Sequence, residues 1–136
     1  MMIEWSDALS TGMPYIDAQH KELIAHFNEL SDAVVRGKGR EETGALLDFL
    51  QFYAQWHFER EEHCMDEYRC PVAATNKAAH RYFVQRFSWL YEQYQRSDVD
   101  PQTVKDTLSD LEAWIVGHIL KVDTRLKLCL NGDAGQ

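Results

Sequence analysis

A chain of 136 residues with 14 lysines and arginines against 22 aspartates and glutamates carries a formal net charge of −8. Nucleic-acid-binding proteins concentrate basic residues against the phosphate backbone, so this charge argues against a nucleic-acid partner. No apolar run approaches the roughly 18 residues that a membrane-spanning helix needs, and the stretch from Met1 to Ser10 lacks the features of a signal peptide. We therefore expect one soluble, cytoplasmic domain, residues 1–136, with no membrane partner.

Apolar residues recur at intervals of three and four residues along four segments, and this periodicity predicts four helices. The first helix is expected to begin near Asp17, which can serve as its N-cap, and to stop at Gly37. The second helix is expected to run from about Glu42 to Asp66.

Prolines mark the expected starts of the other two helices. Pro71 suits the first turn of a third helix, which continues to about Tyr94. Asp100 is expected to cap a fourth helix that has Pro101 at its first position and ends near Leu130.

Short connections between the helices favour antiparallel neighbours. The predicted fold is therefore all-α, an up-down-up-down antiparallel four-helix bundle formed by residues 16–130. An irregular N-terminal arm, residues 1–15, precedes the bundle, and Trp5 is expected to pack this arm onto it. A small polar tail, residues 131–136, is expected to fray.

Six side chains that can bind a metal ion fall on the expected helices: His20, His57, Glu61, His80, His118 and Asp123. His57 and Glu61 are four residues apart, so they share one face of a helix. Burying such a pair against aromatic residues is costly unless the two side chains share a partner, and a metal ion supplies that partner. Four imidazoles and two carboxylates inside a helical bundle are typical of a site for one or two first-row transition-metal ions, iron before others.

The spacing of the last two candidates is less regular. His118 and Asp123 are five residues apart, which is about 140° around an ideal helix. Both side chains can reach one site only if the helix is locally widened or Asp123 leans back, and we expect a single π-turn between them.

Several neighbouring polar residues are expected to point away from the site. His26 and His63 lie six residues beyond two of the candidate ligands, about 240° around the helix. Glu59, Arg60 and Glu62 are expected on a solvated charged face.

Other catalytic and metal-binding patterns do not occur in the sequence. There is no H-E-x-x-H motif, no glycine-rich phosphate loop and no G-x-S-x-G elbow. Cys64, Cys70 and Cys129 form no C-x-x-C pair, so we expect reduced thiols and no zinc site. Cys64 shares the helical face of His57, which leaves a thiol near the metal open, but a small buried hydrophobe is the preferred interpretation.

Taken together, these residues closely resemble the bacterial hemerythrins, small four-helix proteins that hold a non-haem di-iron centre. The resemblance covers essentially the whole chain. It is carried by Trp5, Gly12, the run Ile16–Leu23, the run His57–Glu62, Met65, Pro71, His80, Phe83, Trp114, His118, Ile119 and Asp123.

The resemblance implies two iron ions bridged by an oxo or hydroxo group and by two carboxylates, Glu61 and Asp123. His20 and His57 match the ligands of the iron that binds O2. His80 and His118 match two of the three histidines on the other iron. The apolar wall around bound O2 would consist of Leu23, Phe58, Met65, Trp114, Ile115 and Ile119.

Asn76 occupies the position of the third histidine on that other iron, four residues before His80. Three outcomes are open at this point: the Asn76 amide coordinates the iron, or it holds a water there, or the iron is weakly bound or lost, leaving one iron only.

Three functions follow from these outcomes. The preferred function is O2 binding for storage, delivery or sensing, with O2 and small anions as ligands and any sensing passed to a separate protein partner. Such a protein is a binding protein more than an enzyme. The alternatives are a redox or peroxidase-type protein with a site altered by Asn76, and an iron-holding bundle without O2 chemistry.

Overall fold

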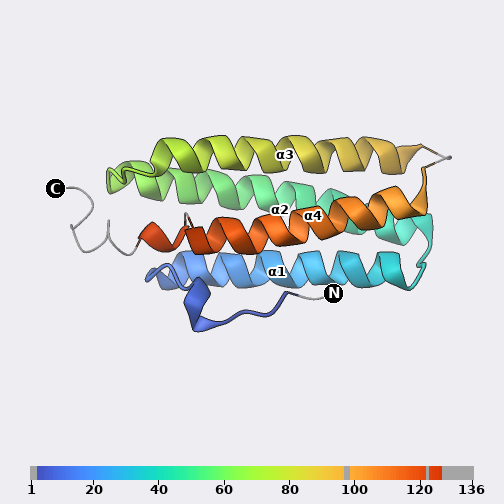
Figure 1. The fold of residues 1–136 in the computed structure, drawn as a ribbon, viewed down its shortest axis with the longest axis horizontal. Coiled ribbons are helices and arrows are strands. Elements are labelled where there is room, and N and C mark those ends of the chain that lie inside the picture. Colours follow the sequence, from blue (N-terminus) through green and yellow to red (C-terminus); the bar gives the residue numbers. More distant parts are fainter. Residues whose placement is uncertain (1–2, 97–98, 122, 127–136) are drawn as a thin grey trace.

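The computed structural model describes residues 3–96, 99–121 and 123–126 and consists of four long helices with two short 3-10 helices (Figure 1). The long helices are α1 (Pro14–Val35), α2 (Arg40–Glu67), α3 (Ala73–Gln95) and α4 (Pro101–Lys121), and the 3-10 helices are η1 (Asp7–Leu9) and η2 (Asp123–Arg125).

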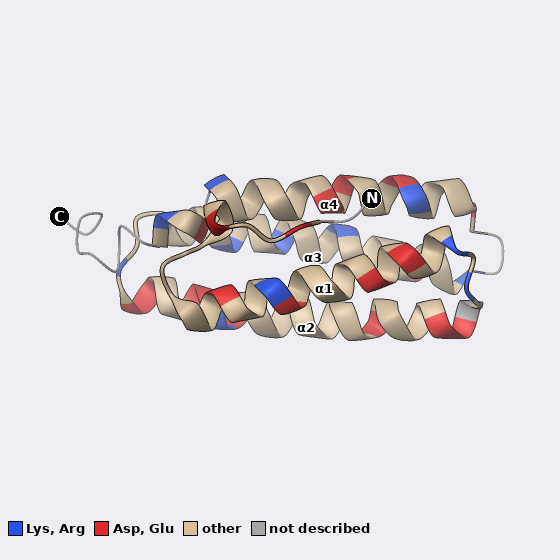
Figure 2. Cartoon of the chain, turned by 90° about the horizontal axis from the view of Figure 1, so that it is seen from below, with Lys and Arg blue, Asp and Glu red and all other residues tan. Residues whose placement is uncertain are grey.

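The long helices form an antiparallel bundle in which each helix runs opposite to the one before it (Figure 1). α1 contacts α2 and α4, and α3 contacts the same two helices, so the four helices surround one interior. The prediction of an all-α, up-down-up-down four-helix bundle is confirmed. Acidic residues recur along α1, α2 and α4 (red in Figure 2).

Two apolar clusters fill the interior. The larger cluster takes side chains from all four long helices, among them the fully buried Phe27, Leu50, Leu90 and Leu111. The smaller cluster, at one end of the bundle, consists of Ile16, Cys64, Met65, Cys70 and Leu126. Buried polar residues lie between the two clusters, and these residues form the candidate site.

The start of α1 differs from the prediction. The helix begins at Pro14, in its first position, and not near Asp17. Proline is favoured there because its fixed φ suits a helix and its missing N–H would be unpaired in any case. Asp17 instead lies in the first turn and fastens the preceding arm: its carboxylate accepts hydrogen bonds from Ser10 Oγ (2.9 Å), Thr11 N–H (2.8 Å) and Thr11 Oγ1 (2.8 Å).

The start of α3 also differs, because the preceding turn is longer than expected. Arg69 adopts a left-handed φ of 53°, and the N–H of Cys70 donates a 2.8 Å hydrogen bond to the carbonyl of Met65. This pattern is typical of a helix C-terminus, and it closes α2. Pro71 lies in the turn that follows, so α3 begins at Ala73.

The predicted start of α4 is confirmed. Pro101 is its first residue, and Asp100 Oδ1 accepts a 3.1 Å hydrogen bond from the N–H of Gln102. The helix ends at Lys121, earlier than predicted. The expected end near Leu130, the tail at 131–136 and Cys129 lie outside the described residues.

The N-terminal arm is held against α1 by backbone and aromatic contacts. The Asn28 amide exchanges two hydrogen bonds with the backbone of Ile3, at 2.9 and 2.8 Å. Trp5 packs against the larger apolar cluster, as expected, with Lys21 Nζ 5.1 Å from the centre of its ring. Of the helices that the structure describes, none has the length and apolar character to cross a membrane.

The carboxylate of Asp17 is expected to stabilise the arm. Replacing Asp17 with alanine removes three hydrogen bonds to a charged acceptor, so the free energy of unfolding should fall by about 2 kcal/mol, as measured by urea denaturation. Asp48→Ala, at an exposed position of α2, is the matched control and should change it by less than about 0.5 kcal/mol. Equal losses in the two variants would contradict this role of Asp17.

Candidate metal centre

The buried polar residues form a layer across the bundle, between the larger and the smaller apolar cluster. On α1, His20 lies between Ile16 of the smaller cluster and Leu23 of the larger one. The layer contains His20, His57, Glu61, Asn76, His80, His118 and Asp123, all of them buried.

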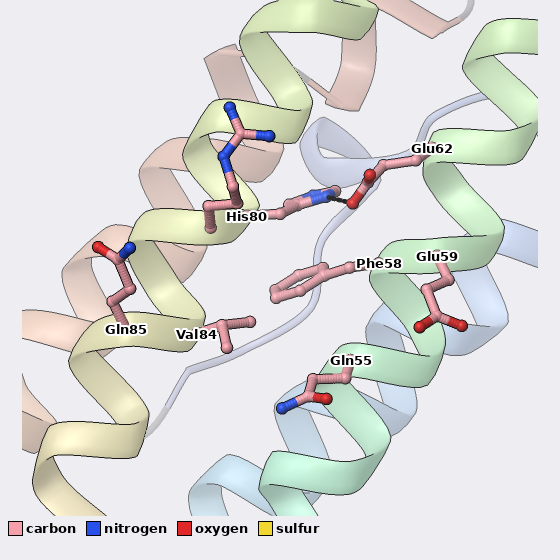
Figure 3. A pocket seen from close by; sticks show the side chains of 8 residues that line it. Gln55, Phe58, Glu59, Glu62, His80, Val84 and Gln85 are labelled. Atoms are coloured by element: carbon pink, nitrogen blue, oxygen red, sulfur yellow. Dashed lines mark hydrogen bonds and ion pairs between the residues drawn. The ribbon is translucent and has the colours of Figure 1, made fainter.

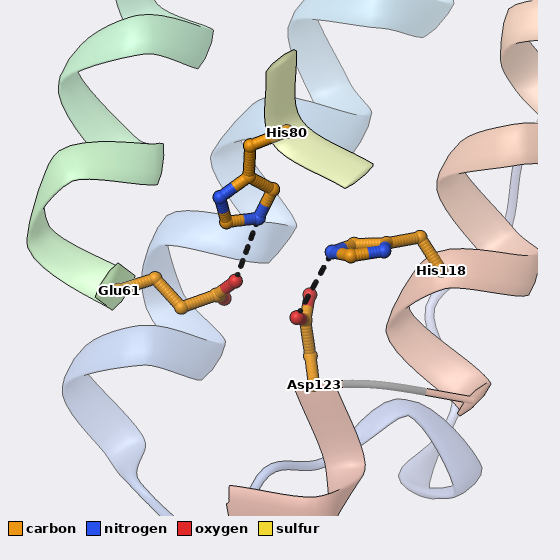
Figure 4. Close-up of side chains that lie close together, drawn as sticks. All are labelled: Glu61, His80, His118 and Asp123. Carbon is orange, nitrogen blue, oxygen red and sulfur yellow. Dashed lines mark ion pairs between the residues drawn. The ribbon is translucent and has the colours of Figure 1, made fainter. Parts of the chain in front are cut away.

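Glu61 lies at the centre of this layer, and its two oxygen atoms face different histidines. Oε2 is 2.8 Å from His20 Nε2 and 3.4 Å from His57 Nε2. Oε1 is 3.1 Å from His80 Nε2 (Figure 4). The Glu61 side chain is fully buried, so its charge depends on these imidazoles rather than on water.

Asp123 divides its two oxygens in the same way. Oδ2 is 3.2 Å from His20 Nε2, and Oδ1 is 3.2 Å from His118 Nε2 (Figure 4). Asp123 reaches the site because α4 ends at Lys121 and Asp123 opens the separate helix η2. The expectation of a π-turn is therefore wrong for the described residues: ending the helix frees the backbone to turn Asp123 back toward His118.

The six predicted ligands thus converge in two groups, which we call lobes. The first lobe contains the imidazoles of His20 and His57, with Glu61 Oε2 and Asp123 Oδ2. The second lobe contains the imidazoles of His80 and His118, with Glu61 Oε1 and Asp123 Oδ1. Donor atoms of His20, His57 and Glu61 lie within 4.8 Å of one another, and so do those of the four residues of the second lobe.

Two further residues orient the histidines, and the sequence did not reveal them. Gln19 Oε1 is 2.7 Å from His57 Nδ1, and Glu62 Oε2 is 2.9 Å from His80 Nδ1. Each contact fixes a ring with its Nε2 toward the interior, as partners of metal-bound histidines do. The expectation that Glu62 lies on a solvated face is wrong in this respect, because the packing of α2 against α3 brings its carboxylate to His80.

A cavity of about 340 Å³ opens between α2 and α3 over the outer edge of the second lobe (Figure 3). Phe58, Glu62, His80 and Val84 are among its lining residues. The Glu62 side chain is 27% exposed, so the hydrogen bond between Glu62 and His80 lies at the boundary between the site and solvent.

Asn76 lies inside the second lobe, one helical turn before His80. Its side chain is fully buried, and Nδ2 donates a 3.2 Å hydrogen bond to Glu61 Oε1. Nδ2 is also 3.2 Å from Met65 Sδ. The Asn76 Oδ1 atom is buried and has no hydrogen-bond partner among the described residues.

Aromatic rings cover both histidines of the second lobe. The Phe58 ring stacks on His80 with 3.9 Å between ring centres, and Trp114 stacks on His118 at 4.6 Å. Of the residues expected around bound O2, Met65 belongs to the smaller apolar cluster, on the other side of the polar layer from the rest. The others belong to the larger cluster or pack against it: Leu23, Phe58, Trp114, Ile115 and Ile119.

Cysteine does not contribute to either lobe among the described residues. Cys64 is a buried free thiol whose Sγ lies 3.4 Å from Met13 Sδ, which favours its interpretation as a small buried hydrophobe. Cys70 is disulfide-bonded, so the expectation of reduced thiols is wrong for this residue.

Within the two lobes, burial and neighbouring side chains shift the pKa values of the histidines and of Glu61. Burial alone would lower the pKa of His20, but hydrogen bonds to Asp123 and Glu61 raise it to about 10. Burial likewise opposes the charged form of His80, but Glu61 and Glu62 raise its pKa to about 9. Burial lowers the pKa of His57. Burial would raise the pKa of Glu61, but hydrogen bonds from His20, His57 and His80 bring it well below its usual value.

The donor set fits a metal ion. Nε2 of His118 and Oδ1 of Asp123 are buried, face each other at 3.2 Å and have no hydrogen-bond partner among the described residues. Buried polar atoms are nearly always paired, so atoms that converge without pairing are explained by a shared ion. Imidazole and carboxylate together suit first-row transition metals.

Residues 11–128 match the protein-family model described as the Hemerythrin HHE cation binding domain. The chain belongs to the hemerythrin family. The resemblance seen in the sequence is therefore confirmed for the family, and the match spans both lobes together with Asn76.

Individual members of the hemerythrin family agree with this assignment. The chain is 30% identical to the bacteriohemerythrin of Methylococcus capsulatus over 131 residues, which cover 96% of this chain and 98% of that protein. It is 30% identical to a bacteriohemerythrin of Pseudomonas aeruginosa over 119 residues, covering 88% of this chain and 75% of the relative.

Solved structures of the hemerythrin family share the fold. A wild-type hemerythrin crystal structure superposes with a TM-score of 0.85 at 30% identity and covers 96% of this chain and 98% of its own. The crystal structure of a hemerythrin mutant superposes with a TM-score of 0.84 at 31% identity, covering 94% of this chain and 96% of its own.

Metal binding should release protons. At pH 7 His20, with a pKa of about 10, and His80, with a pKa of about 9, carry protons in the metal-free protein. A metal ion binds only the neutral imidazole, so loading both lobes at pH 7 should release about two protons per chain. Calorimetric titration with a divalent metal ion, in buffers of different ionisation enthalpy, measures this number. Release of no protons would contradict the protonation assigned to the two histidines.

Proposed function

We propose that this chain holds two iron ions, one in each lobe, and binds O2. The proposal rests on the orientation of two carboxylates. Glu61 and Asp123 each direct one oxygen to the first lobe and the other oxygen to the second. A carboxylate with its oxygens divided in this way can bridge two ions. Two such carboxylates on separate segments, α2 and η2, support a two-ion centre over a single ion.

The chemistry of the donors supports iron. Each lobe offers two imidazoles and two carboxylate oxygens, a mixed set that suits iron better than the thiolate-rich sets of structural zinc sites. Buried di-iron centres built from side chains of facing helices are a recurrent use of four-helix bundles. Membership of the hemerythrin family supports the same assignment.

We propose that O2 binds at the ion held by His20 and His57. When bound, iron supplies reversible electron donation to O2. The residues of the chain supply the surroundings: both imidazoles are 1% exposed, and Gln19 holds the His57 ring in place. The larger apolar cluster, which includes Leu23 and Ile119, adjoins this layer. Such a wall excludes the water and protons that would displace reduced oxygen.

The role that these features favour is O2 storage, delivery or sensing, with small anions as competing ligands. The redox or peroxidase-type alternative has one observation in its favour, the neutral amide of Asn76 inside the second lobe. Consumption of peroxide by the iron-loaded protein, faster than by free iron, would support that alternative.

Iron content of matched variants tests the two-ion proposal. The unmodified protein should bind about two iron ions per chain, and removal of one ligand from one lobe should leave about one. His118→Ala tests the second lobe. His63→Ala is the control, since the His63 side chain is 82% exposed and lies on the same helix as two of the ligands. The readout is iron analysis after anaerobic loading and desalting.

Optical spectra then test O2 binding. Exposure of the reduced iron-loaded protein to O2 should produce charge-transfer bands that disappear on removal of O2, and His20→Ala should abolish them. Fewer than two irons in the unmodified protein, or equal iron content in His118→Ala and His63→Ala, would contradict the two-ion centre. Two irons without an O2-dependent band would leave the iron-holding bundle as the function.

A further inference from the structure

The two lobes offer the same number and kind of donor atoms. Each has two imidazole nitrogens and two carboxylate oxygens, with Glu61 and Asp123 contributing one oxygen to each. Iron with nitrogen and oxygen ligands commonly adopts octahedral coordination, and a shared bridging oxygen adds one ligand to each ion. Ions bound in this way would both keep an open position, so the donor atoms give no reason for only the first lobe to bind an exogenous ligand.

Asn76 identifies the open position of the second lobe. Its Nδ2 donates to Glu61 Oε1, the same oxygen that faces His80 Nε2 at 3.1 Å. The amide therefore lies beside the donors of the second lobe, fully buried. Its Oδ1 has no partner among the described residues, and a buried acceptor without a partner is unfavourable until a donor reaches it.

The amide can hold a ligand of the ion by hydrogen bonding. The hydrogen bond from Nδ2 to Glu61 fixes the orientation of the amide, because exchanging its two ends would break that bond. In its observed orientation the amide can act both as a hydrogen-bond acceptor and as a hydrogen-bond donor to a small bound molecule. Oδ1 can accept a hydrogen bond from water. Nδ2, which donates to Met65 Sδ at 3.2 Å, can donate to an anion instead, because sulfur is a weak acceptor.

The surroundings restrict the guest to a small molecule. Met65 is fully buried and closes one side as part of the smaller apolar cluster. The Phe58 ring covers the face of His80 at 3.9 Å. The cavity between α2 and α3 is lined by this same histidine, so the second lobe lies beside an opening to solvent (Figure 3).

We propose that the second lobe carries a second exchangeable ligand position, in which water or a small anion binds the ion and is held by the Asn76 amide. The inference rests on the proposed two-iron centre. It makes the centre able to bind small ligands on both ions, and it assigns Asn76 as a positioning residue for the ligand of the second.

Azide is the probe for this position. The iron-loaded, oxidised protein is first analysed for iron and then titrated with azide, followed by visible absorption and by the infrared stretch of bound azide. The unmodified protein should bind about two azides per chain in two phases, with two distinct infrared bands. Asn76→His supplies a further imidazole to the second lobe and should reduce the count to about one.

Two more variants distinguish the contribution of the Asn76 hydrogen bond to azide binding from that of the open coordination position. Asn76→Leu keeps the position open but removes the amide, so the second azide should still bind, about tenfold more weakly. Gln55→His places a histidine at an exposed position in the cavity wall and should leave both phases unchanged. Circular dichroism of each variant confirms that it folds, and the count on the unmodified protein does not depend on any variant.

The outcomes distinguish this inference from the proposed function. Two irons with one azide in the unmodified protein would overturn the second position and leave the two-iron centre intact. Two azides in both the unmodified protein and Asn76→His would show that the second azide binds elsewhere and would also overturn the inference. Fewer than two irons would overturn the proposed function itself, and the inference with it.

Discussion

The buried charge of Glu61 is the constraint on which the arrangement of the bundle depends. Moving a charged carboxylate out of water costs several kcal/mol of free energy unless other groups bind it. Here imidazoles from α1 and α3, together with His57 on its own helix, face its two oxygens. Three helices must therefore keep one register along the bundle axis, because sliding any of them by a turn would remove a partner from Glu61.

Apolar packing on both sides maintains that register. The larger cluster fills most of the bundle, and the smaller cluster closes the end beyond the polar layer. Stacking of Phe58 on His80 and of Trp114 on His118 limits the rotation of both rings. The site is thus held by packing as well as by hydrogen bonds, which is a condition for presenting ligands to an ion in fixed geometry.

Helical spacing and family resemblance were enough to name the residues that converge. His57 and Glu61 share a face in any α-helix, and His20, His80, His118 and Asp123 join them in the structure. The route taken by Asp123 could not be predicted, because a widened helix and an ended helix both place it near His118. The spacing led us to expect a widened helix, and the structure instead ends α4 at Lys121.

The orienting residues could not be predicted for a different reason. Gln19 and Glu62 act across helix pairs, so their roles depend on how α1 and α3 rotate against α2, which helical periodicity does not specify. The local errors at Asp17 and Pro71 have a common source. Each residue suits a helix start by its intrinsic preference, but Asp17 lies inside the first turn of α1, where it binds the arm, and Pro71 lies in the turn before α3.

Anomalous diffraction from crystals of the iron-loaded protein, collected at the iron absorption edge, tests the central claim most directly. The account predicts two anomalous peaks, one between His20 and His57 and one between His80 and His118, with one Glu61 oxygen directed to each. A single peak, or two peaks that do not share Glu61, would contradict the assignment of this buried carboxylate as the bridge between two ions.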